Sequence, residues 1–143
     1  MSRLYSLCLL GARCRYDGES KQNPDILEQW KREGGLALCP EQLGGLSTPR
    51  RPATLVGGDG CGVLDGKTAI LNEEGRDVTE NFLRGARECA RLARLAGVTC
   101  AFLKGGSPSC GAVSTSIGWK RSPGEGVTAA LLRRMGIDLT EVD

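Results

Sequence analysis

Short apolar runs alternate with amphipathic segments along this chain. Three of the runs, at positions 4–10, 36–39 and 98–103, have the length of buried strands, and each stops at turn-forming residues. Positions 137–142 can form a last strand. A weaker pair of segments, 53–56 and 67–71 with Val63, predicts a hairpin around the glycine-rich residues 57–60. Residues 112–126 show no clear period.

Helical patterns separate the runs. Asn23 followed by Pro24 predicts the cap and first turn of one helix, and Asp77 with Glu80 resembles a capping box at the start of a second. The apolar positions of the second helix recur at spacings of four and three, at Phe82, Ala86, Cys89, Ala93 and Ala96. A third helix is predicted at residues 127–135. Because strands alternate with helices, we predict an α/β fold of three layers, a mainly parallel, Rossmann-like sheet flanked by helices, in a single domain over residues 1–143.

The composition narrows the classes of function. Of the 143 residues, 40% are hydrophobic but only 4% are aromatic, so a packed core must rely on Leu, Val, Ile and Ala. A formal net charge of +2 is too small to indicate a nucleic-acid-binding or membrane-binding protein. The chain has no histidine, which removes the commonest general base and the commonest zinc ligand. We therefore expect no stable nucleic-acid partner and no membrane partner, and the oligomeric state stays open.

The cysteines indicate a reducing compartment. The chain has seven of them, an odd number that suits metal ligands or small core residues better than a disulfide framework. No apolar run approaches the roughly 20 residues of a membrane helix, and the N-terminal residues lack the pattern of a secretory signal. We predict a cytoplasmic protein.

Three of the cysteines stand at the ends of predicted strands. Cys8 lies within or at the end of the first, Cys39 ends the second, and Cys110 lies in the Gly-, Ser- and Pro-rich loop after the third. In an open parallel sheet, ligands bind beyond the carboxyl ends of the strands, so the fold could unite these thiols. Three thiolates without histidine suit an iron–sulfur cluster or zinc, with one metal position left open. The alternative is that each is a small buried hydrophobe.

The remaining cysteines give weaker signals. Cys89 on the apolar helix face and Cys100 inside a strand are predicted to be core residues, and Cys61 to be an exposed thiol in a loop. Cys14 could be a fourth ligand, although its basic loop gives no positive argument.

Two polar side chains stand close to the candidate ligands. Glu41 follows Cys39 by two residues, and it is either a proton donor and acceptor beside the metal or a solvated carboxylate near a helix start. Ser107 precedes Cys110 by three residues, and it either orients a substrate or simply forms the turn.

A series of short motifs carries a resemblance to a known family. They are Cys8-Leu9-Leu10-Gly11, Cys14-Arg15-Tyr16-Asp17-Gly18, Cys39-Pro40-Glu41, Gly44-Gly45-Leu46, Pro49-Arg50 with Pro52, Asp77-Val78-Thr79 with Phe82 and Gly85-Ala86, Leu103-Lys104, and Ser107-Pro108-Ser109-Cys110-Gly111, in this order. The sequence resembles the bacterial thiouracil desulfidases and the larger family of small domains around them, from about residue 7 to residue 137.

The resemblance implies a [4Fe-4S] cluster held by Cys8, Cys39 and Cys110 only, with Cys14 outside the ligand set. It implies that the free iron binds the sulfur of a thiocarbonyl and that water converts C=S to C=O without any redox change, a hydrolase-type desulfuration. Glu41 matches the family's catalytic carboxylate, and Ser107 matches a serine that positions the substrate. The implied substrate is a small thiolated pyrimidine, a 4-thiouracil-like base or nucleoside.

The chain departs from the family pattern at two places. Thr54 stands where many relatives carry an acidic residue, and residues 112–119 replace an Ile-Tyr-Asp-Gly-like segment that borders the substrate pocket in relatives. In this segment Trp119 either stacks on a base or covers an edge of the core. Two alternatives to the desulfidase therefore stay open. One is a cluster-dependent reaction on a different thiolated metabolite, and the other is a structural or sensing module that binds a cluster or zinc and has no turnover.

Overall fold

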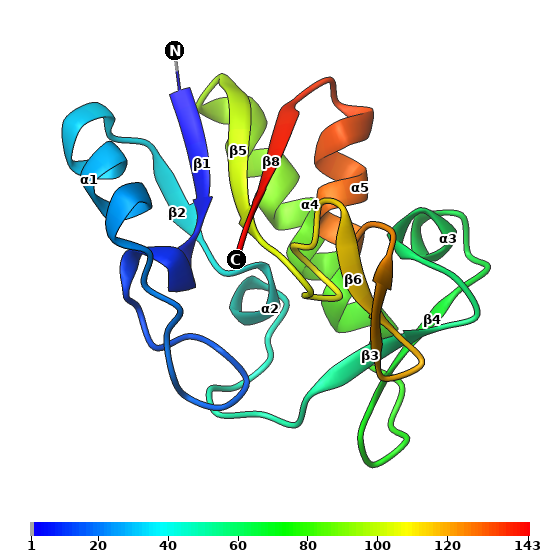
Figure 1. Ribbon diagram of the computed structural model, residues 1–143. Helices are drawn as coiled ribbons and strands as arrows, with labels where there is room; N and C mark the ends of the chain where they lie inside the picture. The colour runs from blue at the N-terminus through cyan, green and yellow to red at the C-terminus, as the bar shows by residue number, and fades with distance from the viewer. Residues whose placement is uncertain (1) are drawn as a thin grey trace.

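A parallel sheet of four strands forms the centre of the molecule (Figure 1). The computed structural model describes residues 2–143. The strands are β1 (Ser2–Ser6), β2 (Leu36–Leu38), β5 (Val98–Lys104) and β8 (Asp138–Val142), in the spatial order β2-β1-β5-β8. All three neighbouring pairs are parallel, so the carboxyl ends of the four strands share one edge.

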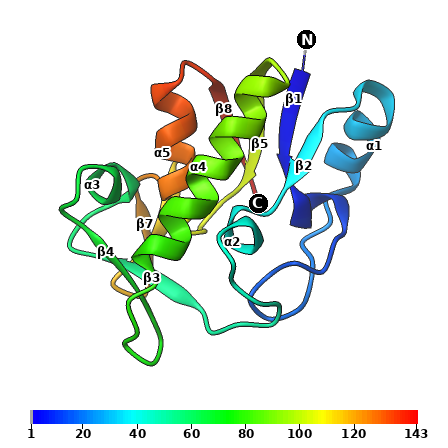
Figure 2. The same cartoon turned by 180° about the vertical axis from the view of Figure 1, so that it is seen from behind.

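Helices cover both faces of this sheet. Helices α4 (Thr79–Leu95) and α5 (Val127–Arg134) lie together on one face (Figure 2), where Leu4, Ala101 and Leu103 pack with them. Helix α1 (Pro24–Glu33) packs on the other face, on which the Tyr5 ring stacks on Phe102 with centroids 5.4 Å apart. Because side chains alternate between the faces of a strand, β1 and β5 serve both layers. The predicted α/β fold with a parallel sheet flanked by helices is confirmed.

One helix start follows the predicted chemistry, and another differs from it by one residue. The side chain of Asn23 accepts hydrogen bonds from the backbone N–H groups of Asp25 and Ile26, as an N-cap does. Asp77 accepts a hydrogen bond from Thr79 N at 2.8 Å but stands one residue before the cap position of α4, so the predicted capping box is displaced by one residue. Ala96 lies beyond the end of α4 and is exposed, so its assignment to the buried face was wrong.

A second sheet packs beside the first. It contains β3 (Ala53–Val56), β4 (Ala69–Asn72), β6 (Ser114–Ile117) and β7 (Lys120–Pro123), in the order β4-β3-β6-β7. The predicted antiparallel pairing of β3 with β4 is confirmed, but the connection holds the short helix α3 (Gly60–Leu64) instead of a simple turn. The β6–β7 hairpin was not predicted, because its Ser, Thr, Lys and Arg residues give no apolar alternation.

Two predicted boundaries change where the candidate ligands lie. The first strand ends at Ser6, and Leu7–Leu10 form the 3-10 helix η1, which Gly11 ends in a left-handed conformation with φ 101°. The second strand ends at Leu38, and Pro40 begins the short helix α2 (Pro40–Leu43), because proline is favourable in the first turn of a helix. Cys8 and Cys39 therefore lie just beyond β1 and β2, outside the strands themselves.

None of the helices described between residues 2 and 143 is long and apolar enough to cross a bilayer.

Candidate active site

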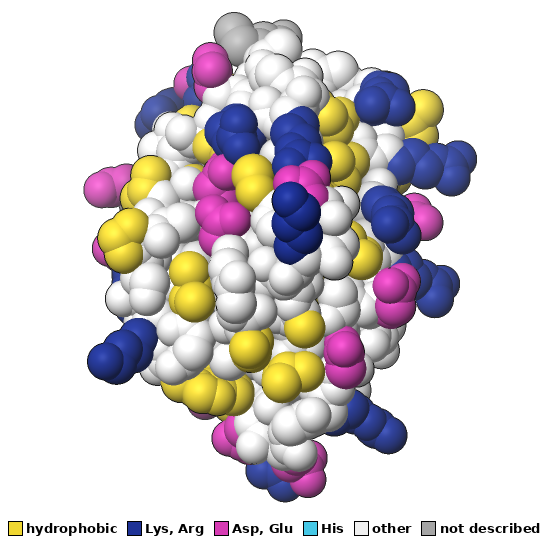
Figure 3. All heavy atoms as spheres, turned by 90° about the vertical axis from the view of Figure 1, so that its right-hand side faces the viewer, with side chains coloured by type: hydrophobic (Ala, Val, Ile, Leu, Met, Phe, Trp, Pro, Cys, Tyr) yellow, Lys and Arg dark blue, Asp and Glu magenta, His cyan; other side chains and the backbone are white. Residues whose placement is uncertain are grey.

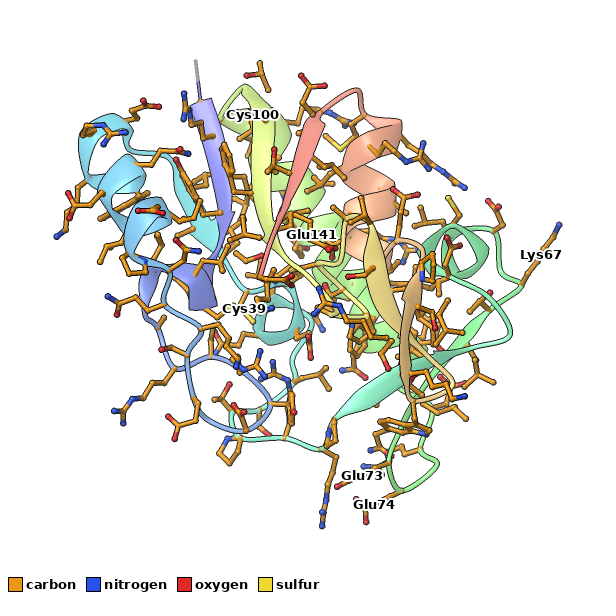
Figure 4. The ribbon with its side chains drawn as sticks, in the orientation of Figure 1. Cys39, Lys67, Glu73, Glu74, Cys100 and Glu141 are labelled. Atoms are coloured by element: carbon orange, nitrogen blue, oxygen red, sulfur yellow. The ribbon has the colours of Figure 1, made fainter. Side chains whose placement is uncertain are left out.

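A cavity of about 450 Å³ lies at the carboxyl ends of β1, β2 and β5. All the predicted site residues line it, namely Cys8, Cys39, Cys110, Glu41 and Ser107. Figure 4 shows Cys39 and Glu141 near this end of the parallel sheet and Cys100 at the opposite end. The fold therefore brings three thiols together from segments about 30 and 70 residues apart, a separation that no local spacing motif could reveal.

Each of the three cysteines is held by a short turn after a strand. The Cys8 carbonyl accepts hydrogen bonds from the N–H groups of Gly11 and Lys21. Cys39 is the cap residue of α2. Cys110 lies in a turn, where its backbone N–H donates to the Ser107 hydroxyl at 3.0 Å. The same hydroxyl accepts the N–H of Ser109 at 3.0 Å. Hydrogen bonds to the backbone groups of Cys8 and Cys110 thus hold the positions from which these two thiols project.

Cys14 also lines this cavity and contacts Cys8 and Cys39. The Cys39 thiol donates to the Cys14 carbonyl at 3.7 Å. A hydrogen bond with Cys39 lowers the pKa of the Cys14 thiol, but its hydrogen bond with Cys8 and its burial outweigh this and raise the pKa to about 11. The cavity therefore contains four thiols, of which Cys14 is the one that the sequence left outside the candidate ligand set.

The thiols of Cys39 and Cys110 are poor acids in the protein without metal. The hydrogen bond with Cys14 and burial raise the pKa of Cys39, and burial raises the pKa of Cys110, which is only 7% exposed. These two thiols stay protonated at neutral pH unless a cation compensates the thiolate charge. Metal binding at such a site is therefore coupled to proton release.

Glu41 is fixed on the cavity wall by an arginine. Arg50 Nε donates to Glu41 Oε1 at 3.0 Å, and the two side chains are only 7% and 18% exposed. Arg50 also donates to the carbonyls of Cys14 at 3.0 Å and Ser47 at 3.1 Å. One guanidinium thus joins the carboxylate to the loop of Cys14. Arg50 belongs to one of the sequence motifs, but nothing local to residue 50 points to a partner at position 41.

The charged residues on the cavity wall are mostly basic. Besides Glu41, the wall includes five cationic side chains, those of Arg15, Lys21, Arg50, Lys104 and Arg121. Burial lowers the pKa of Lys104, whose Nζ donates to the Gly105 carbonyl at 3.2 Å. Arg15 Nε is buried and has no hydrogen-bond partner among the described residues, with the nearest Asp17 oxygen 3.5 Å away. Such a wall stabilises negative charge inside the cavity, including the charge of thiolates.

The β6–β7 hairpin forms the opposite wall. Ser116, Trp119 and Arg121 line the cavity from this hairpin. Thr54, buried on the neighbouring strand β3, hydrogen-bonds to Ser116 Oγ at 2.7 Å and accepts the Trp119 N–H at 3.0 Å. The neutral hydroxyl of Thr54 therefore joins β3 to the β6–β7 hairpin through two hydrogen bonds. The Trp119 side chain is 52% exposed.

The other cysteines lie away from the cavity. Cys89 is fully buried in the core, as predicted, and Cys100 lies within β5 but is only partly buried. Cys61 is not an exposed loop thiol, because it lies in α3, where Arg133 Nη2 donates to its sulfur at 3.2 Å. On the face of the molecule that carries α3 and α5, basic and acidic side chains are interspersed (Figure 3), with ion pairs such as Arg133–Glu125 and Arg134–Asp65.

The donor chemistry of the cavity fits an iron–sulfur cluster. Cys8, Cys39 and Cys110 offer only sulfur ligands. The cavity around them has a volume of about 450 Å³, and its basic side chains can balance the charge of thiolates. Within residues 2–143, no group of three or more His, Cys, Asp or Glu side chains is arranged to hold a single metal ion. The fit therefore rests on the donor set, the cavity and its charge, and not on a preformed mononuclear site.

Comparisons with known proteins agree with this geometry. The family model described as 2-thiouracil desulfurase matches residues 4–143. The "uncharacterized protein YbbK" of Bacillus subtilis (strain 168) is 40% identical over 136 residues, which cover 93% of this chain and 90% of that protein. A solved structure named "[4Fe-4S]-dependent thiouracil desulfidase TudS" is similar with a TM-score of 0.84 and 41% identity, covering 98% of this chain and 89% of that one. The resemblance drawn from the sequence motifs is thereby confirmed, and the chain belongs to the 2-thiouracil desulfurase family.

Proposed function

We propose that this enzyme converts a thiolated pyrimidine, a 4-thiouracil-like base or nucleoside, to its oxo form and releases sulfide, with a [4Fe-4S] cluster bound by Cys8, Cys39 and Cys110. Membership of its family makes the chain a desulfurating enzyme that depends on an iron–sulfur cluster. The observation that carries the finer proposal is the meeting of these three thiols and Glu41 in one cavity. Seven free cysteines agree with a reducing compartment, and we keep the cytoplasm as the expected location.

The reaction balances without an oxidant or a reductant. Water adds its oxygen to the carbon of the C=S group, the C–S bond breaks, and the sulfur leaves as hydrogen sulfide with the two protons of the water. When bound, the cluster supplies a Lewis-acidic iron that no protein side chain occupies, which polarises the C=S bond and accepts the sulfur.

Glu41 is the group that we assign to proton transfer. Its carboxylate lies on the cavity wall, and no histidine exists in the chain to compete for this task. The Arg50 guanidinium occupies Oε1, which leaves Oε2 free to take a proton from water or to return it to the ring or to the departing sulfide. Arg50 thereby holds the carboxylate in one orientation, since its other nitrogens are tied to backbone carbonyls.

Ser107 has one function in the fold and a second that we assign to substrate binding. Its oxygen accepts the N–H groups of Ser109 and Cys110, which shapes the turn that presents the Cys110 thiol. The hydroxyl proton is not used by those bonds and can be donated to a carbonyl or ring nitrogen of a substrate in the cavity.

The alternative function is a structural or sensing module without turnover. One observation favours it, namely that Cys14 lies among the thiols of the same cavity and could complete a four-cysteine ligand set. A cluster with four protein ligands has no open iron, and it would then have a structural or electron-transfer role.

The experiment that separates the two is anaerobic reconstitution with iron and sulfide, followed by an assay with 4-thiouracil. The desulfidase predicts about four irons per chain, loss of the thiocarbonyl absorbance, and one sulfide released for each thiouracil consumed. Cys14→Ala should keep both the cluster and the turnover. Turnover that is absent in the wild type, together with a cluster that requires Cys14, would establish the module instead.

A further inference from the structure

The turn that joins β6 to β7 has an unusual residue at its tip. The register pairs Ile117 with Lys120, so Gly118 and Trp119 alone form the turn, and their φ values are 56° and 68°. Positive φ at both central positions is typical of a type I′ turn, which strongly favours Asn-Gly or Gly-Gly. Within residues 2–143, Trp119 is the only residue other than glycine with a positive φ.

The fold holds the tryptophan in this strained conformation. Trp119 N donates to Thr54 Oγ1 at 3.0 Å, and Gly118 N donates to the Leu55 carbonyl at 2.8 Å. Thr54 and Leu55 are both buried in β3, so the tip of the hairpin is anchored to a rigid strand. Strained backbone persists where the surrounding structure fixes it, and such residues concentrate at functional sites.

Packing within the fold does not explain this tryptophan. The side chain is 52% exposed and belongs to none of the three hydrophobic clusters of the core. Trp119 nevertheless lines the same cavity as the cysteines. A large aromatic ring at a fixed and strained position, half-exposed at the rim of a cavity, is available to a ligand.

We propose that Trp119 is a stacking platform for the planar ring of the substrate. This inference rests on the proposed function and adds a specificity determinant to it. The indole offers a broad apolar face, and stacking on an aromatic side chain suits any nucleobase because every base has a π-face. The enzyme would therefore favour thiocarbonyl groups in planar heteroaromatic rings over those in small acyclic thioamides or thiourea.

Steady-state kinetics of reconstituted variants test this role. Trp119→Gly removes the ring but suits the left-handed turn, so the hairpin should keep its shape. Because stacking on an aromatic side chain is lost, we expect KM for 4-thiouracil to rise about 10-fold, with kcat and iron content unchanged. Trp119→Phe should restore most of the affinity. Trp30→Phe is the matched control, because Trp30 lies on α1 outside the cavity, and its KM should equal that of the wild type.

A binding signal independent of turnover completes the test. In reconstituted Trp30→Phe protein, Trp119 is the only tryptophan, and its emission should be quenched when uracil or uridine, the oxo products, are added. In Trp119→Phe protein only Trp30 remains, and its emission should not change.

These results also separate the two proposals. A wild-type KM in Trp119→Gly, or equal quenching of both tryptophans, would overturn the stacking role while sulfide release by the wild type leaves the desulfidase proposal intact. Absence of sulfide release from the wild type would instead overturn the proposed function.

Discussion

The two walls of the cavity are built by different means. The cysteine wall, formed by Cys8, Cys14, Cys39, Cys110 and Glu41, is carried by the segments that follow parallel strands. The hairpin wall, formed by Ser116, Trp119 and Arg121, is carried by the second, mixed sheet. The first is held by hydrogen bonds at the Cys8 carbonyl and the Cys110 N–H, whereas the second is held by the backbone pairing of β6 with β7 and by hydrogen bonds from the Thr54 side chain.

This difference separates chemistry from recognition. The cysteine wall holds every residue that we assign to cluster binding and proton transfer. The hairpin wall holds the half-exposed tryptophan. A loop or hairpin that contributes little to the core can change without loss of the fold, so substrate preference is more easily altered on the hairpin wall. Three changes test this division, from the largest expected effect to the smallest.

Removal of a single thiol from the cysteine wall should abolish activity. Cys39→Ala leaves only two of the three proposed ligands, so the reconstituted protein should lose most of its iron and all detectable sulfide release. Iron counting and the 4-thiouracil assay measure both. Cys100→Ala is the control, since Cys100 lies in β5 outside the cavity. A Cys39→Ala protein with full iron content would exclude Cys39 from the ligand set.

Neutralising the carboxylate on the same wall should separate catalysis from cluster binding. Glu41→Gln keeps an oxygen that can accept the Arg50 hydrogen bond, but it cannot take a proton. We expect turnover to fall by about 10² to 10⁴ with the iron content unchanged. Glu73→Gln, which alters an exposed ion pair with Arg51, should have no effect. Full turnover in Glu41→Gln would show that the carboxylate is not the proton-transfer group.

Glu141, which holds the segment before the β6–β7 hairpin, should make the stability of the protein depend on pH. From β8, this carboxylate accepts the N–H groups of Ala112, Val113 and Ser114 and the Ser114 hydroxyl, at 2.9 to 3.1 Å. Burial alone would raise the pKa of Glu141, but these hydrogen bonds outweigh it and hold the pKa below its ordinary value. Arg121 lies 3.6 Å away and favours the same charged form.

A lowered pKa in the folded state fixes the sign of the effect. The stabilisation is complete above the unfolded-state pKa of about 4.3 and is lost as the pH falls through the folded-state pKa. Glu141→Gln should therefore reduce the free energy of unfolding by about 1 to 2 kcal/mol at neutral pH, and the difference from the wild type should shrink below about pH 4. Urea unfolding across this pH range measures it. A difference that does not change with pH would mean that the charge of Glu141 is not responsible.

The sequence by itself determined the parallel sheet, its helices and the candidate ligands. Residues 36–39 and 98–103 are apolar runs that end at turn residues, and Asn23 caps a helix through its own side chain. These signals are local, because an apolar run and a cap depend only on neighbouring residues. Their closeness in sequence to Cys39 and Cys110 made Glu41 and Ser107 candidates, to which the family motifs added roles, and the structure puts all five residues around one cavity.

Only the tertiary structure decided the rest of the site. The strained turn at Trp119 depends on Thr54, 65 residues earlier, and the Arg50–Glu41 pair depends on the path of a loop. The buried Arg15 Nε and the presence of Cys14 in the cavity likewise follow from packing. Such contacts join residues with no periodic relation in the sequence, and their side chains serve equally well on a solvated surface. The local pattern therefore specified the elements and the types of residue at their ends, while packing between distant segments specified which of those residues face one another.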